Sequence, residues 1–122
     1  METVLKVIAQ EMQSIGVQYY DMTNTSGKVT YPYVTGEFTQ SEYEFEDGSN
    51  RGDLLMDAWN RGQRIDLVKL NDKIKAHFKD FRKIVDGVAI HISYMGAVPI
   101  RTNDDSLKRL QINLDINWWE GE

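Results

Sequence analysis

Two histidines, His77 and His91, are the residues of this 122-residue chain best suited to acid–base or metal chemistry. Neither belongs to a His-Glu-x-x-His pair, and no serine lies in a Gly-x-Ser-x-Gly turn. The chain has no cysteine, which excludes thiolate ligands, cysteine nucleophiles and disulfides. We therefore expect no enzymatic activity, no bound metal and no cofactor. A hydrolase or nuclease ranks last among the functions considered, because no paired acid and base groups mark a site.

Three glutamates, Glu42, Glu44 and Glu46, alternate with Tyr43 and Phe45. In an extended chain the carboxylates share one face and the two rings share the other. Clustered carboxylates suit a hard cation such as Ca²⁺, but the spacing lacks a calcium-loop pattern. A charged, solvated edge is therefore the favoured interpretation. A third interpretation is electrostatic docking onto a basic partner surface.

Acidic and basic residues are segregated along the chain, whose net charge is −5. Residues 37–57 contain seven acids and one base, Arg51, whereas residues 64–83 contain seven bases, among them Lys69 and Lys73, and three acids. Two solvated surfaces would explain this pattern. The sharper hypothesis is that one patch meets the other on a neighbouring copy, head to tail, and closes a ring. The acidic balance argues against nucleic acid as a partner.

The adjacent Trp118 and Trp119 would point to opposite sides of a strand. By parity Trp118 belongs with the apolar side of its strand. Trp119 is therefore a candidate interface anchor, because exposed tryptophan is common where proteins meet. The alternative is that Trp119 packs under a helix.

Two amphipathic helices are predicted to frame these residues. Apolar residues recur at helical spacing from Glu2 to Ile15, and Gly16 suits the left-handed end of that helix. A second apolar stripe predicts a helix from Leu67 to Phe81, with Asp66 as its cap.

Alternating apolar residues predict strands at 17–20, 33–39, 53–60, 88–94 and 110–118. Both sides of Asp53–Asn60 are largely apolar, which suggests a strand covered on both faces. The stretch Asp47–Gly52 is typical of a loop, and Asp86-Gly87 is typical of a turn. Gly96–Pro99 is predicted to end the strand before it.

The order of these elements predicts one α+β domain over residues 1–122, with two helices packed on one face of a single antiparallel or mixed sheet. The start Met1-Glu2-Thr3 lacks the pattern of a secretory leader, and no apolar stretch approaches the roughly 18 residues of a membrane span. We expect an intracellular protein with no membrane contact.

The order of elements resembles that of the small tail-completion or tail-terminator proteins of long-tailed bacteriophages and of related head–tail joining proteins. An N-terminal amphipathic helix precedes Tyr31-Pro32-Tyr33-Val34-Thr35-Gly36-Glu37, and a polar, charged loop follows. The strand Leu54-Leu55-Met56-Asp57-Ala58-Trp59 then comes just before the second helix, and two strands close the chain. The likeness covers most of the chain as a pattern of segments with one short motif.

This resemblance implies a curved sheet flanked by helices and assembly into a ring, commonly a hexamer. Such a ring ends the tail tube and contacts two partners, the tail tube protein and the head connector protein. It implies no catalysis and no cofactor. The location would be the bacterial host cytoplasm during assembly and then the virion tail. The Glu42–Arg51 loop would order when subunits meet.

Seven residues are therefore expected at the contact with another copy or a partner: Glu42, Glu44, Glu46, Arg51, Lys69, Lys73 and Trp119. Two other functions stay open. One is a monomeric module that binds a peptide or small protein along a sheet edge. The other is a different structural protein of the tail tube or neck.

Overall fold

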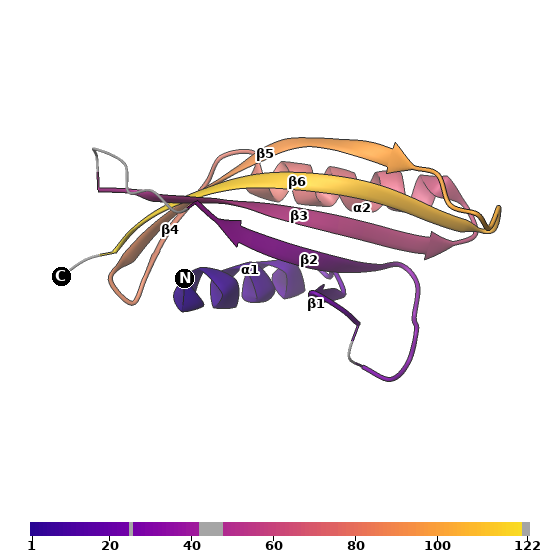
Figure 1. The fold of residues 1–122 in the computed structure, drawn as a ribbon, viewed down its shortest axis with the longest axis horizontal. Helices are drawn as coiled ribbons and strands as arrows, with labels where there is room; N and C mark the ends of the chain where they lie inside the picture. Colours follow the sequence, from indigo (N-terminus) through magenta and orange to yellow (C-terminus); the bar gives the residue numbers. More distant parts are fainter. Residues whose placement is uncertain (25, 42–47, 121–122) are drawn as a thin grey trace.

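The computed structural model describes residues 1–24, 26–41 and 48–120, and these form two helices and six strands (Figure 1). The elements in chain order are α1 (Glu2–Ser14), β1 (Tyr19–Asp21), β2 (Tyr33–Gln40), β3 (Asn50–Arg61), α2 (Arg64–Phe78), β4 (Phe81–Val85), β5 (Val88–Ile100) and β6 (Leu107–Glu120). None of the helices in this part of the chain is long and apolar enough to cross a membrane.

All six strands belong to one mixed sheet in the order β1-β2-β3-β6-β5-β4. β1 runs parallel to β2, and each other neighbouring pair is antiparallel. The long central pair, β3 and β6, is in register from Asn50 opposite Trp118 to Arg61 opposite Leu107. The long strands curve along their length (Figure 1). The predicted α+β class with a curved sheet is confirmed.

One face of the sheet holds the core. Alternate residues of β6, from Ile112 to Trp118, are fully buried, while the residues between them keep some exposure. Both helices place apolar residues against this face and share one hydrophobic cluster with it. The helix residues are Val4, Val7, Ile8 and Met12 from α1 and Leu67, Leu70, Ile74 and Phe78 from α2. Both helices therefore cover the same face, as predicted.

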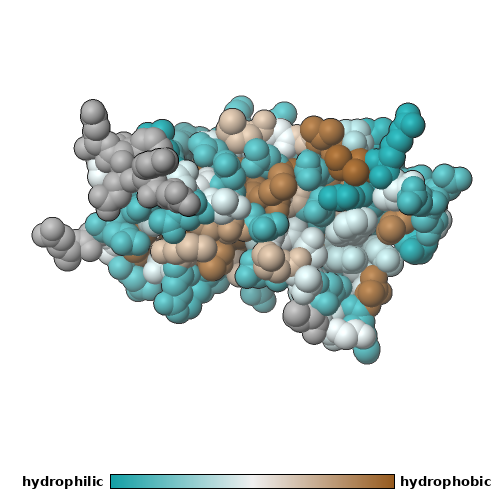
Figure 2. Space-filling model, in the orientation of Figure 1, coloured by the Kyte–Doolittle hydropathy of each residue, from teal (hydrophilic) through white to brown (hydrophobic). Residues whose placement is uncertain are grey.

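The opposite face, called the open face below, is covered by no described element, and this corrects the prediction for β3. Leu54 is fully buried, whereas its neighbour Leu55 is 42% exposed. Trp59 and Asp57 on the same side are half-buried. Apolar residues on both sides of a strand therefore did not mean two covered faces here. Figure 2, in the same orientation as Figure 1, shows a mainly hydrophilic surface with separate hydrophobic patches.

β3 and β5 are longer than predicted because β6, which is itself longer at both ends, supplies a long hydrogen-bonding partner. β3 begins at Asn50, so the second half of the predicted Asp47–Gly52 loop is strand. β5 continues past the predicted break to Ile100, with a bulge between Tyr94 and Gly96 that absorbs one extra residue. Gly96 has a φ of 139°, a conformation that glycine tolerates.

The second helix begins and ends three residues earlier than predicted. α2 ends at Phe78, and Phe81 begins β4, which the sequence analysis missed. Phe81 still packs on the stripe, since its ring centroid lies 5.5 Å from that of Phe78. Asp86 and Gly87 have positive φ angles of 50° and 77°, which suit a two-residue hairpin between β4 and β5.

Asp66 is not the cap of α2. The capping position is Gln63, and Asp66 lies in the first turn. Its carboxylate accepts a hydrogen bond from Asn60 Nδ2 at 3.2 Å, and the same amide nitrogen donates to the Gln63 carbonyl at 2.9 Å. Asn60, 4% exposed, thus joins the end of β3 to the start of α2.

Candidate functional site

The two histidines lie apart, on opposite sides of the sheet. His77 is on α2, where its Nε2 lies 2.9 Å from Glu11 Oε1. His91 is on the open-face side of β5, where its Nε2 lies 2.8 Å from Asp80 Oδ1. Within the described residues, no group of three or more His, Asp or Glu side chains could hold a metal ion. The histidines therefore contact two separate carboxylates and do not share a site.

Glu11 joins three elements around its carboxylate. His77 of α2 contacts Oε1, and Lys83 of β4 lies 3.0 Å from Oε2. Burial disfavours the charged carboxylate and so raises its pKa, but the hydrogen bonds and positive charges of His77 and Lys83 outweigh burial. The net pKa of Glu11 is below its ordinary value. This cluster stabilises the packing of α1 on α2 and β4.

The predicted interface residues fall on both faces of the sheet. Glu42, Glu44 and Glu46 lie outside the described residues. Arg51 is exposed on the open-face side of β3, while Lys69 and Lys73 are exposed on α2, behind the opposite face. The structure therefore does not bring these cations together in one patch.

Lys73 has a specific position at the end of α1. A Cβ added to Gly16 would lie 3.6 Å from Nζ of Lys73, so the lysine ammonium group lies beside the carboxyl-terminal end of α1. The carbonyl groups at this end of a helix favour a positive charge. Lys69, one turn earlier, has no ion pair with any described residue.

Trp118 and Trp119 divide as parity predicts. Trp118 is fully buried, and its ring lies 5.6 Å from that of Phe38. Trp119 is half-buried on the open face, opposite Ala89 of β5. It does not pack under a helix, and its role as an anchor remains a prediction.

An acidic pair lies on the open face. Asp53 of β3 is directly opposite Asp115 of β6. No described cation forms an ion pair with either carboxylate. Like charges directly opposite on neighbouring strands destabilise a sheet. The pair therefore lowers the stability of the isolated chain and offers negative charge to a partner.

Aromatic and cationic side chains also lie together on the open face, at the end of the sheet that is close to the β5–β6 connection. Arg109 donates to Asp57 at 2.9 Å, and its guanidinium lies 5.0 Å from the Trp59 ring centroid. Tyr31 contacts both Arg61 and Tyr33. The Arg61 guanidinium lies 5.8 Å from the Tyr31 ring centroid, and the centroids of the Tyr31 and Tyr33 rings are 5.6 Å apart.

The sequence analysis did not predict this aromatic cluster, although the alternation of side chains along the strands places its members on one face. Tyr31 and Tyr33 are two positions apart, and strand register places Trp59 opposite Tyr33 and Arg109 opposite Trp59. Tyrosine, tryptophan and arginine are the residues most often responsible for affinity at protein interfaces. The cluster therefore suits a protein partner.

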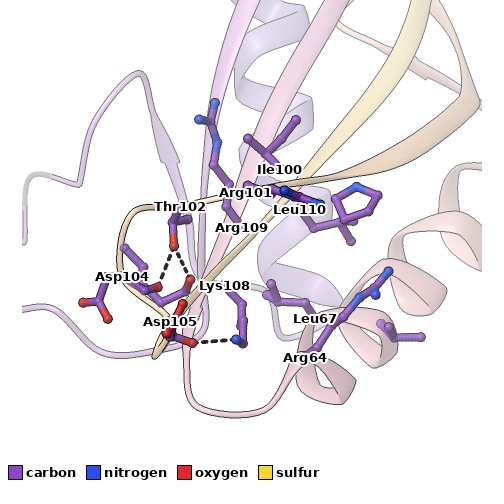
Figure 3. Close-up of a pocket in the computed structure, with 13 residues that line it drawn as sticks. Arg64, Leu67, Ile100, Arg101, Thr102, Asp104, Asp105, Lys108, Arg109 and Leu110 are labelled. Carbon is purple, nitrogen blue, oxygen red and sulfur yellow. Dashed lines mark hydrogen bonds between the residues drawn. The ribbon is translucent and has the colours of Figure 1, made fainter.

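A pocket of about 670 Å³ opens between the first turns of α2 and the β5–β6 connection (Figure 3). Figure 3 shows Arg64 and Leu67 on α2 across from Lys108, Arg109 and Leu110 on β6. The remaining lining residues are Val68, Pro99, Ile100, Arg101, Thr102, Asp104, Asp105 and Leu107.

The acidic residues of this pocket are partly neutralised. Arg61 Nη1 lies 2.8 Å from Asp104 Oδ2. Hydrogen bonds from Arg61 and Ser106 hold the pKa of Asp104 at about 2, so this carboxyl group stays ionised at ordinary pH. Three cations, Arg64, Arg101 and Lys108, and two carboxylates bring charge to the pocket, since the guanidinium of Arg109 is paired with Asp57 on the open face. One of the two carboxylates is already paired with an arginine outside the lining. The pocket therefore has net positive charge.

Neither sequence comparison identifies a relative: no protein-family model matches the chain, and no curated protein matches it significantly.

Proposed function

We propose that this protein is a ring-forming structural subunit of a phage or prophage tail, which ends the tail tube and joins it to the head. Two considerations support the proposal. The segments that resemble tail-terminator proteins fold into the α+β arrangement that the resemblance implies. The polar clusters described above are structural ion pairs or surface patches, which suit binding to other proteins.

The observation that carries the proposal is the distribution of charge over the two faces. On the open face Asp53 and Asp115 lie opposite each other, and neither carboxylate has an ion pair with a described residue. The helix-covered side carries exposed lysines on α2. When one copy turns its open face toward the α2 side of the next, opposite charges meet. Contacts between two different surfaces of identical subunits form rings when the rotation closes.

In the proposed role the mechanism is geometric. Complementary patches close the ring, commonly a hexamer, one end of the ring caps the tail tube protein, and the other end binds the head connector protein. The aromatic cluster around Tyr33 and Trp59 and the half-buried Trp119 are the open-face residues best suited to such contacts. Assembly would take place in the bacterial host cytoplasm and end in the virion tail.

Native mass spectrometry and negative-stain electron microscopy of the purified protein test the ring. Closed oligomers of one size are expected, and they should dissociate as salt is raised because charge complementarity holds them together. Exclusively monomeric protein at high concentration, unchanged by tail tube protein, would contradict ring formation. Particles lacking the gene should have over-long tails, or heads and tails left unjoined. A different defect would favour another tube or neck protein.

One observation favours the alternative of a monomeric peptide-binding module. β4 is an edge strand of five residues, and its residue Ile84 is 76% exposed. An extended peptide can add to such an edge through main-chain hydrogen bonds. A chain that stays monomeric and protects the β4 amides from hydrogen exchange when a peptide binds would support this function.

A further inference from the structure

The pocket between α2 and the β5–β6 connection offers two unpaired guanidinium groups. Arg64 and Arg101 are exposed, and neither guanidinium group has a hydrogen bond or ion pair with another described residue. The other two lining cations are engaged, since Lys108 donates to the Asp105 carbonyl at 2.5 Å and Arg109 is paired with Asp57. A ligand that brings carboxylates to Arg64 and Arg101 would gain charge-assisted hydrogen bonds.

The floor of the pocket is apolar. Leu67 and Leu110 are 2% and 8% exposed, and Val68 and Pro99 add apolar surface at the rim. An anion such as free phosphate would leave this floor uncovered. The pocket therefore suits a ligand that carries both acidic groups and large apolar side chains.

One segment of this chain has that composition. Residues 42–47, which lie outside the described residues, read Glu-Tyr-Glu-Phe-Glu-Asp and contain four acids, two aromatic residues and no base. In an extended backbone the rings and the glutamates point to opposite sides. Rings against the apolar floor would then place carboxylates at the cationic rim.

The described residues that flank the segment and the residues that line the pocket lie at opposite ends of β3 and β6. The segment leaves the β2–β3 hairpin, where Ser41 bonds to Arg51 and where Asn50 is opposite Trp118. The pocket includes Leu110, eight positions away from Trp118 on β6. At about 3.3 Å per residue, eight positions span about 27 Å.

A copy of this chain cannot fill its own pocket. Six residues fixed at both ends of one hairpin extend only about 12 Å beyond it, because the chain must go out and return. The described ends of the segment, Ser41 and Gly48, lie at the other end of the same strands from the pocket. Occupation of the pocket by this segment therefore requires a second copy.

We infer that residues 42–47 of one copy bind in the pocket formed by Arg64, Leu67, Arg101 and Leu110 of the next copy. This inference rests on the proposed ring and adds to it a second contact between neighbouring copies. The contact joins one end of a subunit to the opposite end of its neighbour, so it repeats around a ring or along a filament. Its charge pairing fixes the direction of assembly.

Two charge-reversed chains test the contact. The first carries Glu44→Lys and Glu46→Lys, and the second carries Arg64→Glu and Arg101→Glu. Each alone should be monomeric by light scattering, because the segment of the first chain loses its net negative charge and the second chain presents acids to an acidic segment. An equal mixture should recover assembly, with the two chains alternating. Assembly of the Arg64→Glu, Arg101→Glu chain alone, at the wild-type level, would overturn the inference and leave the proposed ring standing.

A peptide experiment tests the pocket without a ring. A labelled peptide of residues 41–48 is titrated into the Glu44→Lys, Glu46→Lys chain, whose own segment no longer fits the pocket. Saturable binding is expected, at least tenfold weaker when Arg64→Glu and Arg101→Glu are added. Lys69→Glu with Lys73→Glu, an equal charge change on α2 outside the pocket, should weaken binding no more than about threefold, as expected for a long-range charge effect.

The combined results separate the two proposals. Peptide binding that is lost with Arg64 and Arg101, in a protein that never assembles, supports the pocket and contradicts the ring. Peptide binding that is equal with and without these arginines overturns the pocket whatever the oligomeric state. A peptide with Gln and Asn in place of its acids should bind at least tenfold more weakly, and equal binding would also overturn the inference.

Discussion

The ring of Tyr19 lies directly over Gly36, across the parallel pair of β1 and β2. A Cβ added at residue 36 would stand 2.6 Å from Cε2 and 2.8 Å from Cζ of that ring, and closer still to its hydroxyl oxygen. The absence of a side chain at residue 36 therefore allows Tyr19 to pack into the edge of the core. This explains one position of the Tyr31–Glu37 segment in physical terms.

Substituting Gly36→Ala should destabilise the fold by about 1–3 kcal/mol, the usual cost of extra volume in a packed core. Urea denaturation followed by circular dichroism measures this cost. In a Tyr19→Ala background the same substitution should cost much less, because the ring that it meets is gone. An equal cost in both backgrounds would contradict the packing explanation.

Substituting Tyr19→Phe should leave stability unchanged or raise it by about 1 kcal/mol, because a buried hydroxyl group without a partner is costly. The Tyr19 hydroxyl has no hydrogen-bond partner among the described residues. Burial, aided by the nearby charge of Asp21, raises the pKa of Tyr19, so the group stays neutral at ordinary pH. Thermal denaturation provides the measurement, and a loss above about 1 kcal/mol would reveal a partner for the hydroxyl.

Residue periodicity predicted much of the fold. Alternation from Leu110 to Trp118 placed the buried side of β6 correctly, and the three-and-four spacing placed α1 and most of α2. Phe81 continued the helical stripe although it begins β4, because a residue after a helix can still pack on its apolar face. Periodicity therefore identifies which side of an element is buried, but it does not show at which residue the helix ends.

The candidate surfaces depend on strand pairing, which a single sequence does not specify. Asp53 and Asp115 are 62 positions apart, and only the β3–β6 register places them opposite each other. Arg64 and Arg101 likewise meet around one pocket because α2 packs beside the β5–β6 connection. The runs of charge along the chain predicted acidic and basic surfaces in general, and left out the cations between residues 101 and 109.

Substituting Glu11→Gln should cost about 1–2 kcal/mol at pH 7, because His77 and Lys83 lose a charged partner that is only 12% exposed. The ordinary pKa of this group is 4.5, and its folded pKa is lower. The stabilisation is therefore complete above the unfolded value and is lost as pH falls through the folded value. The difference between wild type and variant should vanish in acid.

Urea denaturation of both chains from pH 7 down to pH 3 checks the loss at Glu11. Glu2→Gln is the matched control, because Glu2 forms an exposed pair with Lys6 at 3.5 Å and its loss should cost less than about 0.5 kcal/mol. A Glu11→Gln effect that is equal at every pH would show that packing, and not the charge, stabilises this cluster.

Substituting Asn60→Ala should destabilise the fold by about 1–3 kcal/mol, since it removes the buried amide that bonds to Gln63 and Asp66. Amide hydrogen exchange in the first turn of α2 should become faster, because this link holds the start of the helix. Asn103→Ala, at an exposed loop position, serves as the control and should change neither quantity. Unchanged exchange in α2 would show that apolar packing alone positions the helix.

Substituting Lys69→Glu together with Lys73→Glu should leave the fold intact and abolish ring formation. Both side chains are exposed, so their reversal should cost only about 0.5 kcal/mol, including the lost favourable position of Lys73 at the end of α1. The assembly should nevertheless fail, because these lysines face the Asp53–Asp115 pair on the open face of the neighbouring copy in the proposed ring. Circular dichroism and native mass spectrometry measure the two outcomes separately.

Lys6→Glu with Lys28→Glu makes the same change in net charge at exposed positions outside the proposed contact, and that variant should assemble normally. Rings formed by the Lys69, Lys73 variant at the wild-type level would remove α2 from the interface, because a contact between opposite charges cannot survive reversal of one side.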